Sequence, residues 1–316
     1  MEKAKTKDYN RNGFQRLARS FRAYWELYLF LVPTLLYFIL FRYLPMAGIQ
    51  VAFRDYYPNL GYWGSPWVGL KHFQRFFSSY YAERMIVNTI VLSFGSLFLA
   101  FPFPVILALL LNEVRNSKVK RTIQTITYAP HFLSTVVVVG MVVSLTNINY
   151  GLINVLLKQM GVIDSPINFM IEASWFRPLY IISTIWQETG WNAVIYMAAL
   201  SAVDMELYEA AEVDGAGRLR RMWHITVPCI APTMITMLIL NAGKVMNLGY
   251  EKVLLMQNDL NKATSDVITT YVYQQGVLKN QFSYSTAVNL FNSVVNTLLI
   301  FTVNGIARRV SDTSLW

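Results

Sequence analysis

Residues 209–217 read EAAEVDGAG, and the chain continues directly with the basic segment RLRR (218–221). This polar stretch lies between two long apolar stretches. A short polar connection between two membrane helices needs neither the paired alanines nor the turn that Asp214 and Gly215 predict, in which glycine tolerates a positive φ. The stretch therefore indicates a structured element, whose role depends on the segments around it.

The composition indicates a membrane protein. Of the 316 residues, 54% are hydrophobic and only 14% are charged, whereas a soluble domain carries about 25% charged residues. A helix needs about 20 apolar residues to cross a bilayer. Six stretches meet this requirement, the third with Pro130 and His131 in its first turn: 28–49, 86–111, 127–145, 179–200, 230–248 and 287–306. We predict an all-α polytopic membrane protein with six transmembrane helices.

Positive charge orients these spans. Sixteen of the 27 lysines and arginines lie in the segments 1–26, 112–126, 201–227 and 307–316, whereas nine lie in the longer loops on the opposite side. Because positively charged loops stay in the cytoplasm, both termini and the EAAEVDGAG segment are predicted to be cytoplasmic. The net charge of +9 is thereby explained by topology and by attraction to anionic membrane lipid. It does not indicate nucleic-acid binding, which would need a soluble basic face.

The segment 205–213 favours a helix with one flat face. Leu207, Ala210, Ala211 and Asp214 recur at steps of three and four residues. Glu209 stands beside this face, where it can pair with a cation on another protein. Two interpretations remain open: a docking element, or an ordinary amphipathic loop whose arginines enforce topology.

Several enzyme classes lack their motifs in this chain. There is no phosphate-binding G-x-x-x-x-G-K-[ST] loop and no glycine-rich dinucleotide fingerprint. No G-x-S-x-G elbow or H-E-x-x-H pair occurs, and the three histidines lie in different segments. We therefore expect no catalytic residue, metal or cofactor in this chain. A membrane enzyme or sensory scaffold that uses intramembrane carboxylates remains an alternative.

Three predicted spans carry polar residues at helical spacing. Such residues inside a bilayer face a cavity, a bundle interior or a partner. The stripes are Thr184, Glu188, Asn192 and Tyr196 with Gln187 and Trp191 alongside; Asn241, Lys244, Asn247 and Glu251; and Ser285, Asn289, Asn292 and Asn296. As candidates that line a sugar pathway we take Glu188, Trp191, Asn192, Lys244, Asn247 and Asn292. The alternative is that the stripes hold helices together, with Glu188 paired to Lys244.

The opening segment and its surroundings resemble a known family. The EAA signature of binding-protein-dependent ABC importer permeases is similar to Glu209-Ala210-Ala211, Asp214-Gly215-Ala216 and Ile225-Thr226-Val227-Pro228 with Pro232. Asn88-Thr89 opens the second span as in that family. The carbohydrate branch, which handles complex oligosaccharides, is similar to FRYLPMAGIQVAF (41–53), GYEKVLLM (249–256), SDVITTYVY (265–273) and SLW (314–316).

The resemblance implies a type I ABC importer permease fold in a bacterial plasma membrane. The basic residues before the first span predict a cytoplasmic tail with a lead-in helix on the inner leaflet (1–26). A first transmembrane helix with an extracytoplasmic loop (27–84) follows, then the five-helix core that the resemblance implies (85–306) and a cytoplasmic tail (307–316). The core contains the coupling loop (205–228). In the family this loop docks on a cytoplasmic ATPase, with Glu209, Ala210, Ala211, Asp214 and Gly215 as the coupling residues.

The resemblance also implies partners. A second related permease would complete a heterodimer, a cytoplasmic ATPase dimer would bind ATP and Mg²⁺, and an extracytoplasmic binding protein would deliver an oligosaccharide. A permease for a non-sugar solute is the alternative within transport.

Overall fold

The computed structural model describes residues 23–310 and Ser314. The predicted tail and lead-in helix fall almost entirely outside these residues. The described chain is helical, with an isolated bridge between Arg54 and Trp67, so the all-α prediction is confirmed. The helices are α2 (Trp25–Phe38), η1 (Ile39–Tyr43), α3 (Leu44–Met46), η2 (Ala47–Phe53), α4 (Gly61–Gly64), α5 (Lys71–Phe77), α6 (Ala82–Ala100), α7 (Pro102–Glu113), α8 (Ser117–Tyr128), η3 (Ala129–Phe132), α9 (Thr135–Leu145), α10 (Leu152–Gln159), α11 (Ala173–Ser201), α12 (Met205–Val213), α13 (Arg218–Arg221), η4 (Met222–Thr226), α14 (Val227–Ala242), α15 (Tyr250–Met256), α16 (Lys262–Ser265), α17 (Ile268–Tyr273), η5 (Gln274–Leu278) and α18 (Phe282–Val310).

Four helical runs in the described part of the chain are long and apolar enough to cross a membrane. They are Trp25–Phe53, Ala82–Glu113, Arg218–Ala242 and Phe282–Arg309, and they correspond to the first, second, fifth and sixth predicted spans. The fourth predicted span lies within α11, a single helix of 29 residues. The polar residues along α11 make this helix less apolar than the four runs. The count of six spans therefore stays a prediction.

The third predicted span is not one straight helix. The pair Ser117–Phe132 and Thr135–Leu145 is bent by 102°. Pro130 lies at the break, where proline cannot donate a backbone hydrogen bond, and Ser134 caps α9 by accepting from the Val137 N–H at 3.4 Å. Helix α8 begins at Ser117, inside the segment assigned from sequence to a loop. Asn116 caps it by accepting from the Lys118 N–H at 2.9 Å.

The fifth predicted span also ends early. Its helix stops at Ala242, so Lys244 and Asn247 do not continue the helical stripe that the sequence predicts, and Glu251 belongs to α15. The backbone leaves the helix because α18 supplies other partners: the Met246 N–H donates to Asn296 Oδ1 at 3.0 Å, and Asn292 Nδ2 donates to the Met246 carbonyl at 3.3 Å. Buried backbone groups need such partners wherever a helix ends.

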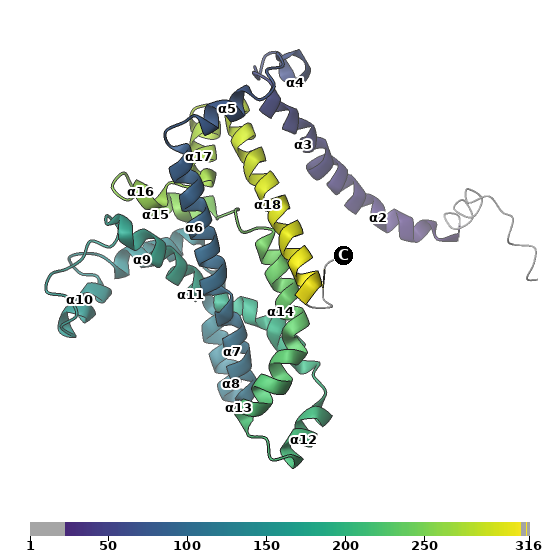
Figure 1. Cartoon of the computed structure of the whole chain (residues 1–316), viewed down its shortest axis with the longest axis vertical. Helices are drawn as coiled ribbons and strands as arrows, with labels where there is room; N and C mark the ends of the chain where they lie inside the picture. The colour runs from purple at the N-terminus through teal and green to yellow at the C-terminus, as the bar shows by residue number, and fades with distance from the viewer. Residues whose placement is uncertain (1–22, 311–313, 315–316) are drawn as a thin grey trace, which may run out of the picture.

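Helix α11 lies at the centre of the bundle and packs on α6, α7, α8 and α14 (Figure 1). The C-terminal half of α11 shares an apolar cluster with Val105, Ala108 and Ile230. At Gly190 the backbones of α8 and α11 touch, because a Cβ there would lie 2.0 Å from the Thr127 carbonyl oxygen. Helix α2 contrasts with this core. None of its residues is buried, and it leaves the bundle at an angle.

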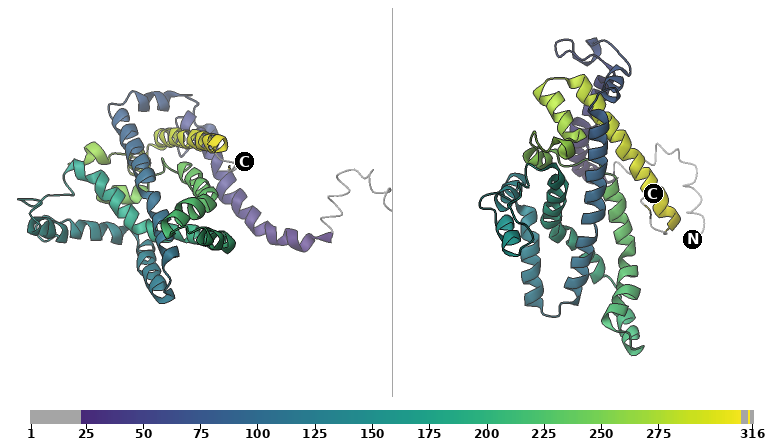
Figure 2. Two further views of the ribbon diagram at one scale, coloured as in Figure 1. Left: turned by 60° about the horizontal axis from the view of Figure 1, so that its bottom comes forward. Right: turned by 60° about the vertical axis from the view of Figure 1, so that its left-hand side comes forward.

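The two ends of the bundle carry different loops. The turn between α7 and α8 lies at the same end as α12, whereas α4 and α5 lie at the other (Figure 2). At that other end Arg54 lies over the Trp67 ring at 5.5 Å, and a hydrogen bond from Lys71 holds the pKa of Asp55 below its usual range. The arrangement places residues 112–126 and 201–227 on one side, as the charge pattern predicts.

Candidate functional site

The first part of the site is the loop between α11 and α14. Helix α12 begins and ends at the residues predicted from sequence, Met205–Val213. Asp204 caps its N-terminus by accepting from the Glu206 N–H at 3.0 Å. Aspartate suits this position because it satisfies a free N–H and carries negative charge toward the positive end of the helix dipole.

A glycine turn ends α12. Gly215 has a φ of 73°. The Ala216 N–H donates to the Ala211 carbonyl at 2.8 Å, and the Gly215 N–H donates to the Glu212 carbonyl at 3.0 Å. This pair of bonds is the Schellman motif, in which the residue after the helix adopts a left-handed conformation. The turn predicted from Asp214 and Gly215 is therefore present, with the positive φ that it anticipated.

Two side-chain contacts fix α12 against the start of the next helical run. Arg221 donates to Glu212 at 2.9 Å, and the hydroxyls of Tyr208 and Thr226 lie 3.0 Å apart. From the sequence, the arginines of this loop are expected to turn toward water or lipid headgroups and to enforce topology. Arg221 instead turns inward, because the glycine turn brings α13 back beside the acidic side of α12. A π-helical turn, η4, then precedes Pro228 and accommodates the missing N–H of proline.

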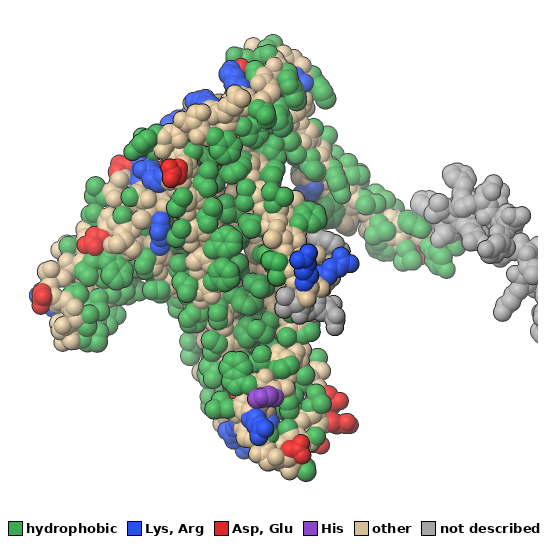
Figure 3. All heavy atoms as spheres, in the orientation of Figure 1, with side chains coloured by type: hydrophobic (Ala, Val, Ile, Leu, Met, Phe, Trp, Pro, Cys, Tyr) green, Lys and Arg blue, Asp and Glu red, His purple; other side chains and the backbone are tan. Residues whose placement is uncertain are grey.

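The opposite side of α12 is open. Glu209 and Ala210 are exposed, Ala211 is half-buried, and Val213 is 89% exposed. Figure 3 shows charged side chains gathered at this end of the molecule, below a largely hydrophobic flank. The loop thus presents small and apolar side chains beside Glu209 on a helix whose two ends are fixed.

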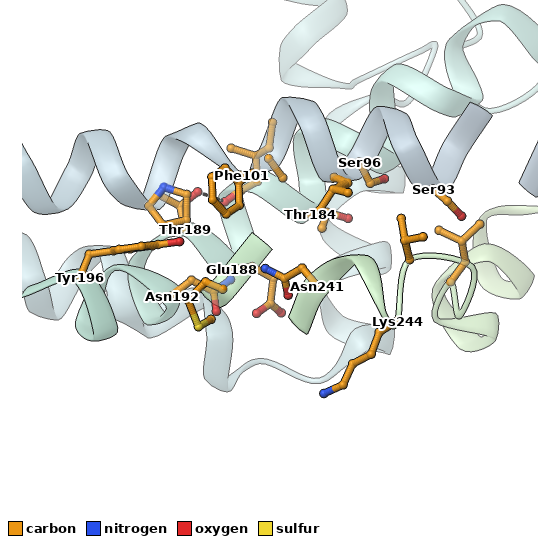
Figure 4. Close-up of a pocket in the computed structure, with 17 residues that line it drawn as sticks. Ser93, Ser96, Phe101, Thr184, Glu188, Thr189, Asn192, Tyr196, Asn241 and Lys244 are labelled. Atoms are coloured by element: carbon orange, nitrogen blue, oxygen red, sulfur yellow. Dashed lines mark hydrogen bonds between the residues drawn. The ribbon is translucent and has the colours of Figure 1, made fainter. Parts of the chain in front are cut away.

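The second part of the site is a cavity of about 240 Å³ between α6, α7, α11 and α14 (Figure 4). Three predicted pathway residues line it: Glu188, Asn192 and Lys244. The cavity also has hydroxyl, amide and aromatic side chains from several helices: Ser93, Ser96, Phe101, Thr184, Thr189, Tyr196 and Asn241. Such groups can hydrogen-bond or stack on a polar solute.

Three other predicted pathway residues lie outside this cavity. Asn247 Oδ1 accepts from Asn292 Nδ2 at 3.2 Å and from Asn296 Nδ2 at 3.0 Å. These amides join the segment after α14 to α18, which is the helix-linking role that the sequence left as an alternative. Trp191 is 44% exposed and stacks on His131, with ring centroids 4.9 Å apart.

Glu188 does not pair with Lys244 in the described structure. Its Oε2 lies 3.1 Å from His131 Nδ1, so the alternative that paired Glu188 with Lys244 is wrong. The cause is the break after α8, which brings His131 beside α11 at the level of Glu188. The same break stacks the imidazole on Trp191. Lys244 is exposed and contributes to the cavity without an ion pair among the described side chains.

Sequence reasoning missed Ser93, Ser96 and Thr189. The two serines stand three residues apart in α6, a spacing that places them on one helix face. Their signal was weak, because serine and threonine inside a membrane helix also bond to their own backbone, as Thr189 does to the Ile185 carbonyl at 2.6 Å.

Fold and site together define a helical membrane transport subunit, with a central polar cavity and a structured loop at one end. The chain belongs to the family described as "Binding-protein-dependent transport system inner membrane component", which matches residues 76–312. It is therefore a multi-pass inner membrane protein and a transporter subunit, rather than the enzyme that the sequence left open.

Relatives and solved structures agree with this family. Protein LplB of Bacillus subtilis (strain 168) is 48% identical, over 96% of this chain and 95% of its own length. The polygalacturonan/rhamnogalacturonan transport system permease protein YteP of the same organism is 47% identical, over 92% of this chain and 90% of its own. A bacterial ABC transporter involved in the import of the acidic polysaccharide alginate has a chain with a TM-score of 0.86 and 38% identity, covering 93% of this chain and 99% of that one. The type I ABC permease fold predicted from sequence is confirmed.

Proposed function

We propose that this chain forms half of the translocation pathway of an ATP-driven oligosaccharide importer. The observation that carries the proposal is the position of α12 in the loop that joins α11 to α14, two helices that line the polar cavity. A force applied to α12 therefore reaches residues of the cavity through both helices. The names of the relatives, a polygalacturonan/rhamnogalacturonan permease and an alginate importer, support an oligosaccharide as the solute.

In this proposal, a partner protein supplies the free energy for transport. A cytoplasmic ATPase dimer binds ATP and Mg²⁺ and receives the exposed side of α12. Glu209, Ala210 and Ala211 form the contact, and Asp214 and Gly215 shape the turn that presents it. Both termini and α12 face the cytoplasm, as the charge distribution predicts.

Two further partners complete the importer. A second related permease pairs with this chain, and α2 supports this proposal because none of its side chains is buried in its own bundle. An extracytoplasmic substrate-binding protein delivers the sugar at the opposite end, near α4 and α5. A solved alginate importer has been crystallised in complex with a sugar-bound periplasmic protein, and its permease has a TM-score of 0.87 to this chain, at 37% identity, with 95% of this chain covered.

The test is charge reversal on α12. In a complex reconstituted with the ATPase and second permease, Glu209→Lys is expected to abolish ATPase co-purification and ATP-driven oligosaccharide uptake, because it places a cation against a cationic partner. Asp164→Lys is the matched control: it reverses an exposed acid in the segment between α10 and α11, away from α12. Normal co-purification and uptake with Glu209→Lys would refute the docking proposal.

A further inference from the structure

Lys252 is a buried cation beside the cavity. It lies on α15, is 7% exposed, and donates from Nζ to Thr184 Oγ1 at 2.9 Å. Nζ also lies 5.3 Å from the centre of the Tyr180 ring. Thr184 lines the cavity, and its hydroxyl donates a hydrogen bond to the Tyr180 carbonyl at 2.8 Å. The ammonium of Lys252 thus lies immediately behind a threonine that faces the cavity.

This ammonium lacks a matching anion. No carboxylate of the described residues lies within 4.0 Å of it. The nearest cavity carboxylate, Glu188, interacts with it electrostatically at longer range but is in contact with His131. A buried charge is costly unless it is paired. The hydroxyl of Thr184 and the face of Tyr180 compensate only partly, because an ammonium carries three donors.

The cavity therefore has an excess of positive charge. Lys244 lines it and Lys252 lies behind it, against one carboxylate, Glu188. Figure 4 shows Glu188 on α11 and Lys244 on the segment that follows α14, with the Lys244 ammonium extending away from the other labelled side chains. Lys252 is shielded from water, so its charge acts over a longer distance than that of an exposed lysine. A solute that carries carboxylates supplies the missing anion, whereas a neutral sugar leaves both ammonium groups unpaired.

We propose that Lys252, together with Lys244, makes the pathway selective for oligosaccharides that carry carboxylates, such as uronates. The inference rests on the proposed function and names the substrate class of the same cavity. Lys252 acts through the cavity lining at Thr184, and Lys244 acts from the segment that follows α14. The alternative is that Lys252 only neutralises Glu188, in which case it has no preference among sugars.

The test uses two probes with the same sugar backbone, one charged and one neutral: trigalacturonate and its fully methyl-esterified form. Equilibrium binding of each is measured on the complete importer in lipid nanodiscs. For wild type we expect tighter binding of the acid, weakening as salt is raised, with no salt dependence for the ester. Lys252→Met is expected to weaken binding of the acid about tenfold while changing the ester less than about twofold, since the lost interaction is with charge. Lys252→Arg, which keeps the charge, should retain most of the preference.

Each other outcome has a defined meaning. Equal loss of both probes in a Lys252→Met complex of normal melting temperature would overturn the inference and assign Lys252 to structure. If that variant does not assemble, the salt dependence of wild type and the exposed variant Lys244→Met decide: equal binding of acid and ester in wild type overturns the inference. ATP-driven uptake of neutral sugars without preference for acids would sink this inference alone. Absence of ATP-driven uptake of any oligosaccharide would sink the proposed function.

Discussion

Gly215 holds a backbone conformation with a φ of 73°, which costs an L-residue with a Cβ about 1–2 kcal/mol. Gly215→Val is therefore expected to distort the turn after α12 and to reduce oligosaccharide-stimulated ATP hydrolysis, with the chain still inserted in the membrane. Gly217→Ala is the matched control, because Gly217 has a φ of −69° and a Cβ there meets nothing within 4 Å. Full stimulation in the valine variant would show that this turn is not needed for coupling.

Glu188 provides a second test at the scale of one side chain. Removing its contact with His131 should destabilise the chain by about 1 kcal/mol, since both side chains are partly exposed. A double-mutant cycle with Glu188→Gln and His131→Phe, read by thermal unfolding in detergent, should therefore show coupling. The cycle of Glu188→Gln with Lys244→Met should be additive. Coupling confined to the Lys244 cycle would contradict the geometry described above.

Among single residues, the loop could be predicted from sequence and the cavity only in part. The helix around Glu209, its two alanines and the glycine turn depend on local rules of spacing, capping and φ. The contact of Glu188 is with His131, 57 residues earlier in the chain, and local patterns carry no information on such distances. Lys252 was counted only as a loop charge, because its burial results from packing on α11.

At the scale of helices, α8 and α11 approach each other closely at Gly190. Among the described glycines, a Cβ added at this position would meet the nearest neighbouring atom. A side chain at Gly190 would collide with the Thr127 carbonyl, so Gly190→Val should separate the two helices and lower stability by about 1–3 kcal/mol or more. The comparison is Gly140→Ala in α9, where a Cβ meets nothing within 4 Å and helix propensity improves. Thermal unfolding of both variants checks this; equal melting temperatures would exclude a tight α8–α11 contact.

The helix ends show why sequence periodicity overestimated one stripe. Apolar and polar residues continue at helical spacing past Ala242, but the amides of Asn292 and Asn296 on α18 bind the backbone and the amide side chain of that segment. These partners come from a helix about 50 residues later in the chain. By contrast, the first, second and sixth predicted spans lie within apolar helical runs of the structure, because their length alone satisfies the bilayer.

At the scale of the whole molecule, α2 has no buried side chain in its own bundle. If a second permease packs on it, a benzophenone attached at Leu35→Cys in a Cys229→Ser background should cross-link to that partner. Leu35 is 55% exposed. The same probe directed to Ala287→Cys, at a fully buried position, should give no intermolecular product. Absence of cross-linking from Leu35 in an assembled complex would indicate that lipid alone surrounds α2.

The two connections of α12 are unequal. Toward α14, the four non-helical residues 214–217 are bridged by the contacts of Arg221 with Glu212 and of Tyr208 with Thr226, and one helical run continues from Arg218 to Ala242. Toward α11 the chain passes through three non-helical residues, Ala202 to Asp204. Helix α11 is also clamped by α7 and by backbone contact with α8. Of the two cavity-lining helices that the loop joins, α11 is therefore held in place by its neighbours, whereas α14 is coupled more directly to α12. Movement of α12 would therefore be passed on to Asn241 on α14 more directly than to Glu188 and Asn192 on α11, so a solute bound by both helices would lose its contacts with one before the other.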